Sequence, residues 1–211
     1  MFITLEGIEG AGKGTVLRTL QAWLADRGIA CLFTREPGGS ALGQQLRALL
    51  LDARQQVAPQ AELFLYLADR AQHVSEIIRP SLESGKVVIS DRYADSTIVY
   101  QGYGRQLDIK MLYTLNTIAV GDLWPDMTIL LDVSPDIGLA RARKRNEELG
   151  QEVAEGRFEA LEMAFHERTR NGYLHWASQN PERFVVVNAE DSPEIVAQNC
   201  LRLVQERIFL P

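Results

Sequence analysis

The stretch Gly7-Ile-Glu-Gly-Ala-Gly-Lys-Gly-Thr15 lies between a short apolar run, Phe2–Leu5, and a segment with helical spacing. Glycines allow a backbone to curl so that successive N–H groups face one point, and the N-terminus of a following helix adds positive potential there. A lysine at the end of such a loop contacts the outer phosphates of a nucleotide. The stretch therefore predicts a phosphate-binding loop between a strand and a helix, with Lys13 as its cation.

One position in this loop departs from the common pattern. Many phosphate loops carry a hydroxyl directly after the lysine, where it binds Mg²⁺. Here Gly14 occupies that position and Thr15 follows one residue later. Direct coordination of a metal ion by a hydroxyl is therefore left open.

Outward from the loop, short apolar runs alternate with amphipathic segments along the whole chain. Besides Phe2–Leu5, the runs are Ile29–Phe33, Val87–Ile89, Met127–Leu131 and Phe184–Val187. Nearly all are apolar on both alternating faces, which is typical of strands covered on both sides. The apolar side chains at helical spacing are Leu17, Leu20 and Leu24 near the start, and Val196, Cys200, Leu203 and Val204 near the end.

This alternation predicts an α/β fold with a five-stranded parallel sheet and helices on both faces. No repeat, low-complexity stretch or Gly/Ser linker interrupts the 211 residues, so residues 1–211 are expected to form a single domain. The order of the strands cannot be deduced from their spacing.

Composition narrows the class of protein. The chain is 46% hydrophobic and 24% charged, with 22 basic and 28 acidic residues and a net charge of −6. This balance argues against a partner that is a nucleic-acid polymer. No uncharged run approaches the roughly 20 residues that a membrane-spanning helix needs, so no membrane partner is expected. The start of the chain lacks the pattern of a signal peptide, so we expect a cytoplasmic protein. Cys31 and Cys200 match no metal-binding spacing, and we expect both to be reduced thiols.

Two further polar clusters follow predicted strands. Asp91-Arg92-Tyr93 ends the run that begins at Val87, and Arg35–Gly39 follows the second run. A carboxylate at a strand end beside a phosphate loop is a typical holder of hydrated Mg²⁺, and an arginine is suited to phosphate oxygens. The alternative for Asp91 and Arg92 is a solvated ion pair. Because ligands of open α/β sheets bind at the carboxyl ends of the strands, three such clusters indicate one site.

The longest stretch without a predicted strand runs from Asp132 to Phe184. It contains the basic cluster Arg141–Arg145, a polar interruption at 146–150, and a helical pattern from about Phe158 to Ala177. Such an excursion is either a functional lid or a surface loop, and the cluster of cations favours a lid at roughly residues 141–158.

At this point the whole chain resembles the bacterial thymidylate kinases, a family of P-loop nucleoside-monophosphate kinases. The motifs that carry the resemblance are Gly7–Thr15, Thr34–Gly39, Asp69-Arg-Ala-Gln-His73 and Asp91-Arg-Tyr-Ala-Asp-Ser-Thr-Ile-Val-Tyr-Gln101-Gly. The last is the most specific, because its full spacing is peculiar to that family. The resemblance implies transfer of the γ-phosphoryl group of ATP to dTMP, with Mg²⁺ as cofactor, and a homodimer.

The resemblance also implies roles for individual residues on the ATP side. Lys13 and the loop amides would hold the ATP phosphates, and Glu9 would contact the sugar of the monophosphate. Asp91 would hold Mg²⁺ through water. The residues assigned to ATP are Gly7, Ile8, Glu9, Gly10, Ala11, Gly12, Lys13, Gly14 and Thr15.

On the acceptor side, Arg47 and Arg92 would bind the dTMP phosphate, with Arg92 also near the transferred group. Tyr66 would stack on thymine and Arg70 would bind a base oxygen. Since Tyr66 lies four residues before Arg70, both can face one pocket from a helix. The full set assigned to dTMP is Glu9, Glu36, Pro37, Arg47, Tyr66, Arg70, Arg92, Thr97, Tyr100 and Gln101, with Tyr100 crowding the sugar 2′ position.

The lid is expected to supply a further cation to the transferred phosphate. Some relatives carry an arginine in the phosphate loop where this chain has Gly14, so the resemblance is to the subgroup whose arginine comes from the lid. The candidates for a catalytic role are Arg143, Arg145 and Arg157, with Arg141 and Lys144 also available. The family phrase Asp-Arg-Phe-Glu appears here as Gly156-Arg-Phe-Glu159. The turn Ala189–Ser192 is expected near adenine.

Other interpretations remain at this stage. Another nucleoside-monophosphate kinase, such as an adenylate kinase, also carries Gly-Lys-Gly-Thr, but Glu9 and Val16 depart from that group's usual proline and glutamine. A non-catalytic nucleotide-binding regulator would not need the phosphate-binding cations present here. A GTPase is disfavoured because no Asn-Lys-x-Asp sequence occurs. The three histidines are expected to be satisfied or solvated, and His166 and His175 are spaced too far around a helix to share a metal ion.

Overall fold

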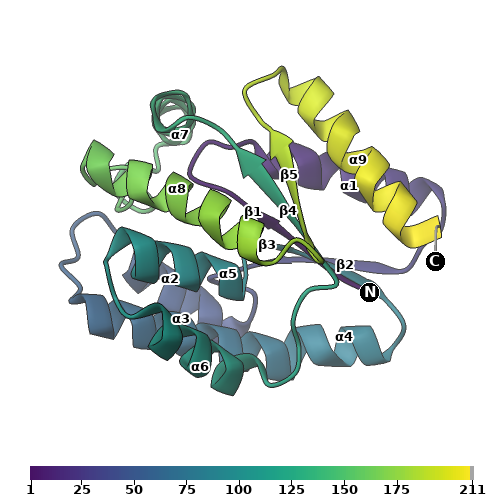
Figure 1. The fold of residues 1–211 in the computed structure, drawn as a ribbon, viewed down its shortest axis with the longest axis horizontal. Helices are drawn as coiled ribbons and strands as arrows, with labels where there is room; N and C mark the ends of the chain where they lie inside the picture. Colours follow the sequence, from purple (N-terminus) through teal and green to yellow (C-terminus); the bar gives the residue numbers. More distant parts are fainter. Residues whose placement is uncertain (210–211) are drawn as a thin grey trace.

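A computed structural model describes residues 1–209 as a parallel five-stranded sheet between two layers of helices (Figure 1). The strand order is β2-β3-β1-β4-β5. The strands are β1 (Phe2–Glu6), β2 (Cys31–Arg35), β3 (Val87–Asp91), β4 (Met127–Asp132) and β5 (Phe184–Asn188). The predicted fold class is therefore confirmed, and the structure supplies the strand order that spacing left open.

The three central strands carry the core of the sheet. β1 is buried along its whole length, and β3 and β4 are buried except at their last residue. The prediction of strands covered on both sides is correct for these three. It is wrong for β2 and β5, which are the sheet edges and only partly buried: Val186 of β5 is 48% exposed.

The helices cover both faces of the sheet. Helices α1 and α9 pack together over one face, and α3, α6 and α8 lie over the other, with α2 packed on α3 (Figure 1). Their bounds are α1 (Lys13–Asp26), α2 (Ala41–Leu51), α3 (Pro59–His73), α4 (Arg79–Glu83), α5 (Ala94–Thr97), α6 (Ile109–Val120), α7 (Pro135–Leu149), α8 (Met163–Gln179) and α9 (Pro193–Phe209), with π-helical turns at η1 (Val74–Ile78) and η2 (Ile98–Gly104). None of the helices described is long and apolar enough to cross a membrane.

The amphipathic spacing seen in the sequence corresponds to buried helix faces. Leu20 and Leu24 of α1 and Cys200 and Val204 of α9 are fully buried in the main hydrophobic cluster. Both thiols are free; Cys200 is buried and Cys31 is half-buried. The pattern therefore predicted correctly which faces pack on the sheet.

Several element boundaries differ from the prediction. Helix α7 continues to Leu149, so most of the expected polar interruption at 146–150 is helical, and β1, β3, β4 and β5 extend one or two residues beyond the apolar runs. β2 begins at Cys31 rather than Ile29 and continues to Arg35, paired in register with β3. Helix α8 begins at Met163 rather than Phe158. Phe158 lies in the turns between α7 and α8, where its ring packs edge-on against Tyr100 with centroids 5.4 Å apart. Residues 150–162 are hereafter the connecting segment.

Strand register brings the polar clusters of the sequence to one edge. Leu5, two residues before Gly7, lies opposite Asp91, and Asp91 lies opposite Arg35 on the other side. Since parallel strands end at the same edge, the phosphate loop, the 35–39 turn and Asp91-Arg92 meet there. The expected convergence of the three clusters is confirmed.

Candidate active site

The loop between β1 and α1 requires glycine for steric reasons. Gly10 and Gly12 have φ values of 71° and 96°, in the left-handed region that side chains disfavour. A Cβ on Gly10 would also lie 1.9 Å from the carbonyl oxygen of Gly138 in α7. Within residues 1–209 no side chain caps the N-terminus of α1, and this 14-residue helix directs its first amides toward the loop. The loop is thus built to accept an anion at a helix N-terminus.

Lys13 folds back across this loop. Its Nζ donates to the carbonyl oxygens of Gly7, at 3.0 Å, and Ile8, at 3.3 Å. Burial lowers the pKa of Lys13 to about 8, with the charge of Arg92 acting in the same direction and Asp91 and Glu9 opposing it. A bound phosphate would favour the charged ammonium, because it supplies the negative charge that the site lacks.

A pocket opens over the carboxyl ends of the strands and brings most of the predicted residues together. The predicted residues that line it are Glu9, Gly10, Lys13, Glu36, Pro37, Arg47, Tyr66, Arg70, Asp91, Arg92, Thr97, Tyr100, Gln101 and Arg145. Arg35, from the predicted 35–39 cluster, lines it too, and the lining residues without an individually predicted role are Leu51, Ser96, Glu155, Phe158 and Glu159. Ser96 lies inside the motif that begins at Asp91, so that motif was the available signal for it.

Arg92 and Glu9 line the pocket and form an ion pair there. Arg92 has a φ of 69°, unusual for a non-glycine residue, and its guanidinium donates to Gly7 O at 2.9 Å and to Glu9 Oε1 at 3.0 Å. The hydroxyl of Tyr100 donates to the same Glu9 oxygen at 2.6 Å, and the Arg92 guanidinium lies over the Tyr100 ring. Burial opposes ionisation of Glu9, but Arg92 and Tyr100 outweigh it and lower the pKa of this carboxyl. Glu9 is therefore an anion that holds both neighbours in place.

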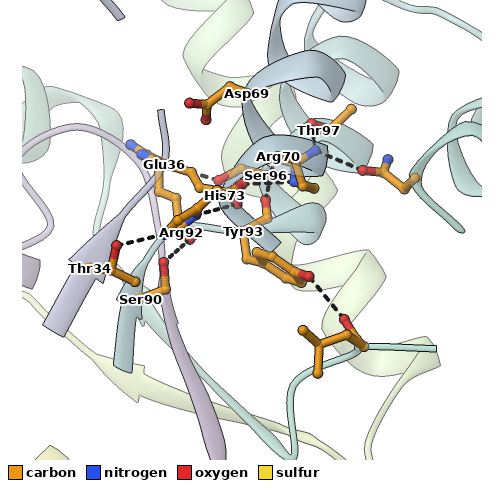
Figure 2. Close-up of polar contacts among 12 residues, drawn as sticks. Thr34, Glu36, Asp69, Arg70, His73, Ser90, Arg92, Tyr93, Ser96 and Thr97 are labelled. Carbon is orange, nitrogen blue, oxygen red and sulfur yellow. Dashed lines mark hydrogen bonds and ion pairs between the residues drawn. The ribbon is translucent and has the colours of Figure 1, made fainter. Parts of the chain in front are cut away.

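Arg70 lies deeper and is held from several sides (Figure 2). Its guanidinium donates to Glu36 Oε2 at 2.8 Å, to Thr97 Oγ1 and Asn116 Oδ1 at 2.7 Å each, and to the Tyr93 carbonyl at 3.0 Å. Tyr66, one helical turn earlier on α3, lines the same pocket, as the spacing predicted. These four contacts fix the orientation of the Arg70 guanidinium. Its role in binding the base stays a prediction.

Glu36 also organises the turn beneath Arg70. Its Oε1 is 2.9 Å from His73 Nδ1, and His73 Nε2 is 2.7 Å from Thr34 Oγ1 (Figure 2). The peptide bond between Glu36 and Pro37 is cis.

The three histidines differ in their surroundings. His73 has partners on both ring nitrogens and is a satisfied core histidine, as expected, and His175 is exposed. The expectation is wrong for His166, whose buried ring nitrogens make no hydrogen bond of good geometry within residues 1–209; Nδ1 lies 3.8 Å from Glu9 Oε2.

Arg47, predicted to bind the acceptor phosphate, already has hydrogen-bond partners within the protein. Arg47 Nη1 donates to the Pro37 carbonyl at 3.0 Å, and its Nε and Nη2 donate to Glu155 Oε1 at 3.2 and 3.0 Å. Glu155 belongs to the connecting segment, so this ion pair bridges the pocket from α2 to that segment. A phosphate bound by Arg47 would share or replace this carboxylate.

The predicted lid cations separate into different surroundings. Arg145 lines the pocket and is 3.5 Å from Glu159. Arg143 donates to the Glu159 carbonyl, Lys144 is exposed beside Glu148, and Arg141 donates to the Ala189 carbonyl in the turn expected near adenine. Arg157 is buried, donating to the Leu50 carbonyl and pairing with Glu62. The structure thus brings Arg145 to the pocket and does not bring Arg143 or Arg157 there.

The pocket has free carboxylate oxygens suited to a magnesium ion. Asp91 Oδ1 and Glu9 Oε2 are buried and lack hydrogen-bond partners among the residues described. In that part of the chain, no three His, Cys, Asp or Glu side chains gather as a metal-binding cluster. Because Mg²⁺ commonly binds through one or two carboxylates, waters and substrate phosphates, these residues fit a water-mediated ion better than a protein-only cage.

Comparisons with known proteins agree on one family. The thymidylate kinase family profile matches residues 5–200. A thymidylate kinase of Nitratidesulfovibrio vulgaris (strain DP4) is 58% identical over 205 residues, covering 97% of this chain and 92% of that protein. One of Nitratidesulfovibrio vulgaris (strain DSM 19637 / Miyazaki F) is 56% identical over 212 residues, covering 100% and 99%. The crystal structure of thymidylate kinase from Ehrlichia chaffeensis superposes with a TM-score of 0.77 at 31% identity, covering 97% of this chain and 98% of that one.

Proposed function

Because this chain belongs to the thymidylate kinase family, we propose that its pocket transfers the γ-phosphoryl group of ATP to dTMP, giving ADP and dTDP. The observation that carries the site assignment is the meeting of Lys13, Arg92 and Asp91 at one sheet edge, beside the aromatic and amide side chains of α3 and η2. Phosphate-binding and base-binding groups thereby face one pocket.

On the donor side, the loop Gly7–Thr15 and Lys13 bind the ATP phosphates. The uncapped amides of α1 and the Lys13 ammonium together offset the negative charge there. The turn Ala189–Ser192, to which Arg141 donates, lies at the end of β5 and is our candidate contact for adenine.

On the acceptor side, Arg47 and Arg92 bind the dTMP phosphate, and Glu36 with Pro37 shapes the turn beneath it. Tyr66 stacks on thymine while Arg70, Thr97 and Gln101 line its edge. Glu9 contacts the sugar, and Tyr100 excludes a 2′ hydroxyl. The role of Tyr100 is supported by its surroundings. It is only 5% exposed and its hydroxyl donates to Glu9, so the ring cannot readily move aside for a 2′ hydroxyl.

Catalysis on this account is positioning and electrostatics. The acceptor is already an anion, so charge neutralisation matters more than a strong base. Lys13 and Arg92 line the same pocket as Glu9 and offset charge on the transferred oxygens. Mg²⁺, held by Asp91 through water and by phosphate oxygens, would supply additional charge neutralisation when bound.

The lid on this account comprises roughly residues 141–158, and Arg145 is its candidate catalytic cation because its side chain lines the pocket. Arg157 then serves by holding the connecting segment on Leu50 and Glu62. Closure of such a segment excludes water, which would otherwise hydrolyse ATP. We treat residues 1–211 as one kinase domain that includes this lid.

We further propose a homodimer in the cytoplasm. Exposed large apolar side chains occur on α3 and on the two helices that pack against it, namely Leu42 and Leu49 of α2, Phe64 of α3, and Met111, Tyr113 and Ile118 of α6. Such an apolar surface supports contact with a second copy. The two free thiols fit a reducing compartment.

The mechanism is tested by replacing Arg92. For Arg92→Ala we expect turnover with ATP and dTMP to fall by about 10²-fold or more. The variant lacks the positive charge of Arg92, which offsets negative charge on the transferred phosphoryl group. Circular dichroism should report an intact fold. Arg79→Ala removes an exposed arginine paired with Asp122 and should leave turnover near normal. Near-normal turnover of Arg92→Ala would refute the assignment.

A further inference from the structure

Glu62 is a buried carboxylate that anchors Arg157 of the connecting segment but has so far no role in recognition of the base. It lies in the first turn of α3, four residues before Tyr66 and eight before Arg70, and its side chain is fully buried. Two guanidinium groups pair with it: Arg105, at 3.1 Å, and Arg157 of the connecting segment. Both guanidinium groups donate to the Glu62 oxygens, so this carboxylate serves as a hydrogen-bond acceptor, and the two cations offset the cost of burying it.

The remaining contact of Glu62 is with a residue of the pocket. Gln101 Nε2 donates to Glu62 Oε1 at 2.7 Å, and Gln101 is itself 1% exposed. A side-chain amide has a donor end and an acceptor end, whereas an ionised carboxylate only accepts. Glu62 therefore fixes which end of Gln101 it receives, and the carbonyl Oε1 is the end left for a ligand in the pocket that Gln101 lines.

Arg70 supplies the complementary group. It lies two helical turns from Glu62 on α3 and lines the same pocket, and a guanidinium only donates. A base bound between these side chains therefore meets an acceptor at Gln101 and a donor at Arg70. Thymine offers the matching pattern, with a ring N3–H beside the O4 carbonyl. Cytosine carries the reverse, an unprotonated N3 beside an amino group.

We propose that Glu62 is a positioning residue that makes Gln101 an acceptor and thereby selects 4-oxo pyrimidines over cytosine. The proposal rests on the proposed function, in which Gln101 and Arg70 line the edge of the base. Discrimination follows because cytosine would leave buried polar groups facing like partners, and unpaired buried groups are costly.

The test is Glu62→Gln, which keeps the size of the side chain but can present either amide end to Gln101. We measure kcat/KM for dTMP, for dCMP and for 3-methyl-dTMP, which has no N3–H. The ratio of dTMP to dCMP should fall about tenfold or more, mainly through KM for dTMP, because Gln101 is free to rotate. If Glu62 had a purely structural role, the substitution would lower kcat/KM for dTMP and for dCMP by the same factor. An unchanged ratio of the two values would therefore overturn the proposal.

Two controls separate positioning from loss of stability. Arg105→Gln removes a partner of Glu62 but leaves the Glu62–Gln101 contact, so it should lower the melting temperature without changing the ratio. In a Gln101→Ala background, Glu62→Gln should change the ratio no further; an equal change there would show that Glu62 acts through another residue. If Glu62→Gln does not fold, Glu62→Asp, which shortens the reach to Gln101, must lower the same ratio.

Failure of the proposed function is distinguishable from failure of this proposal. A wild-type protein that uses dCMP as well as dTMP would contradict the function itself, whatever Glu62 does. A wild-type protein selective for dTMP, with a Glu62→Gln variant equally selective, would contradict the positioning role alone.

Discussion

At the scale of single residues, the pocket holds its cations by pairing them with acids. Arg92 pairs with Glu9 and Arg70 with Glu36, both within about 3 Å. Lys13 differs, because among the residues described its Nζ donates to two backbone carbonyls and to no carboxylate. Burial lowers the pKa of its ammonium to about 8, so the charge of Lys13 changes with pH in the mildly alkaline range.

ATP binding should therefore weaken at alkaline pH. Lys13 is charged below its pKa of about 8 and becomes neutral as pH rises through that value, which removes a phosphate contact. We expect the Kd for ATP, measured by calorimetry, to rise steadily above that pH. Lys13→Arg keeps its charge and should remove this alkaline dependence. An ATP affinity for the wild type that stays constant to about pH 9.5 would contradict the role of Lys13.

Sequence predicted the site residues that depend on local pattern, and missed those that depend on tertiary contact. Lys13 follows from the loop, and Tyr66 with Arg70 follows from their spacing of four on a helix. Arg143 and Arg145 could not be told apart, since residues two apart point to nearly opposite sides of a helix and the placement of α7 decides between them. Glu155 gave no local signal because its partner, Arg47, is far away in sequence.

At the scale of elements, the connecting segment is attached to the end of α2. The Ala53 amide donates to the Val153 carbonyl at 2.8 Å, and the Arg157 amide donates to the Leu51 carbonyl at 3.3 Å. Between these contacts, Glu155 pairs with Arg47 on α2. The same arginine is thus assigned to the acceptor phosphate and to the segment that covers it.

Removing the Glu155 charge should favour acceptor binding. The carboxylate and the dTMP phosphate compete for Arg47, and a partly exposed ion pair contributes up to about 1 kcal/mol. For Glu155→Gln we expect dTMP to bind about two- to fivefold more tightly in calorimetry, as that free energy implies. Glu152→Gln, an exposed neighbour, should change nothing. Unchanged or weaker dTMP binding by Glu155→Gln would contradict the competition.

The elements themselves were predictable where they are apolar and buried. The central strands and the helix faces on the sheet follow from periodicity alone. The start of α8 does not follow from periodicity. Phe158 fits the helical pattern in the sequence, but its ring packs against Tyr100 from an irregular turn that precedes the helix. The strand order was also beyond reach, since pairing in a parallel sheet depends on contacts between distant segments.

At the scale of the whole molecule, a net charge of −6 coexists with the pocket that we propose binds two anionic nucleotides. Four pocket arginines pair with carboxylates in the same pocket: Arg47 with Glu155, Arg70 with Glu36, Arg92 with Glu9 and Arg145 with Glu159. Cations held in this way are positioned before the substrate arrives, which reduces the cost of ordering them. The overall charge therefore describes the exterior, while the fold concentrates cations at one edge.

Transfer from ATP to dTMP can be measured as kcat/KM for ADP formation with dTMP, dUMP, AMP and UMP as alternative acceptors. We expect dTMP to be preferred, and AMP and UMP to be poorer by about 10²-fold or more, because their bases or sugars leave pocket groups unpaired or crowd Tyr100. A preference for AMP, or no dTMP-dependent formation of ADP, would contradict the proposed transfer.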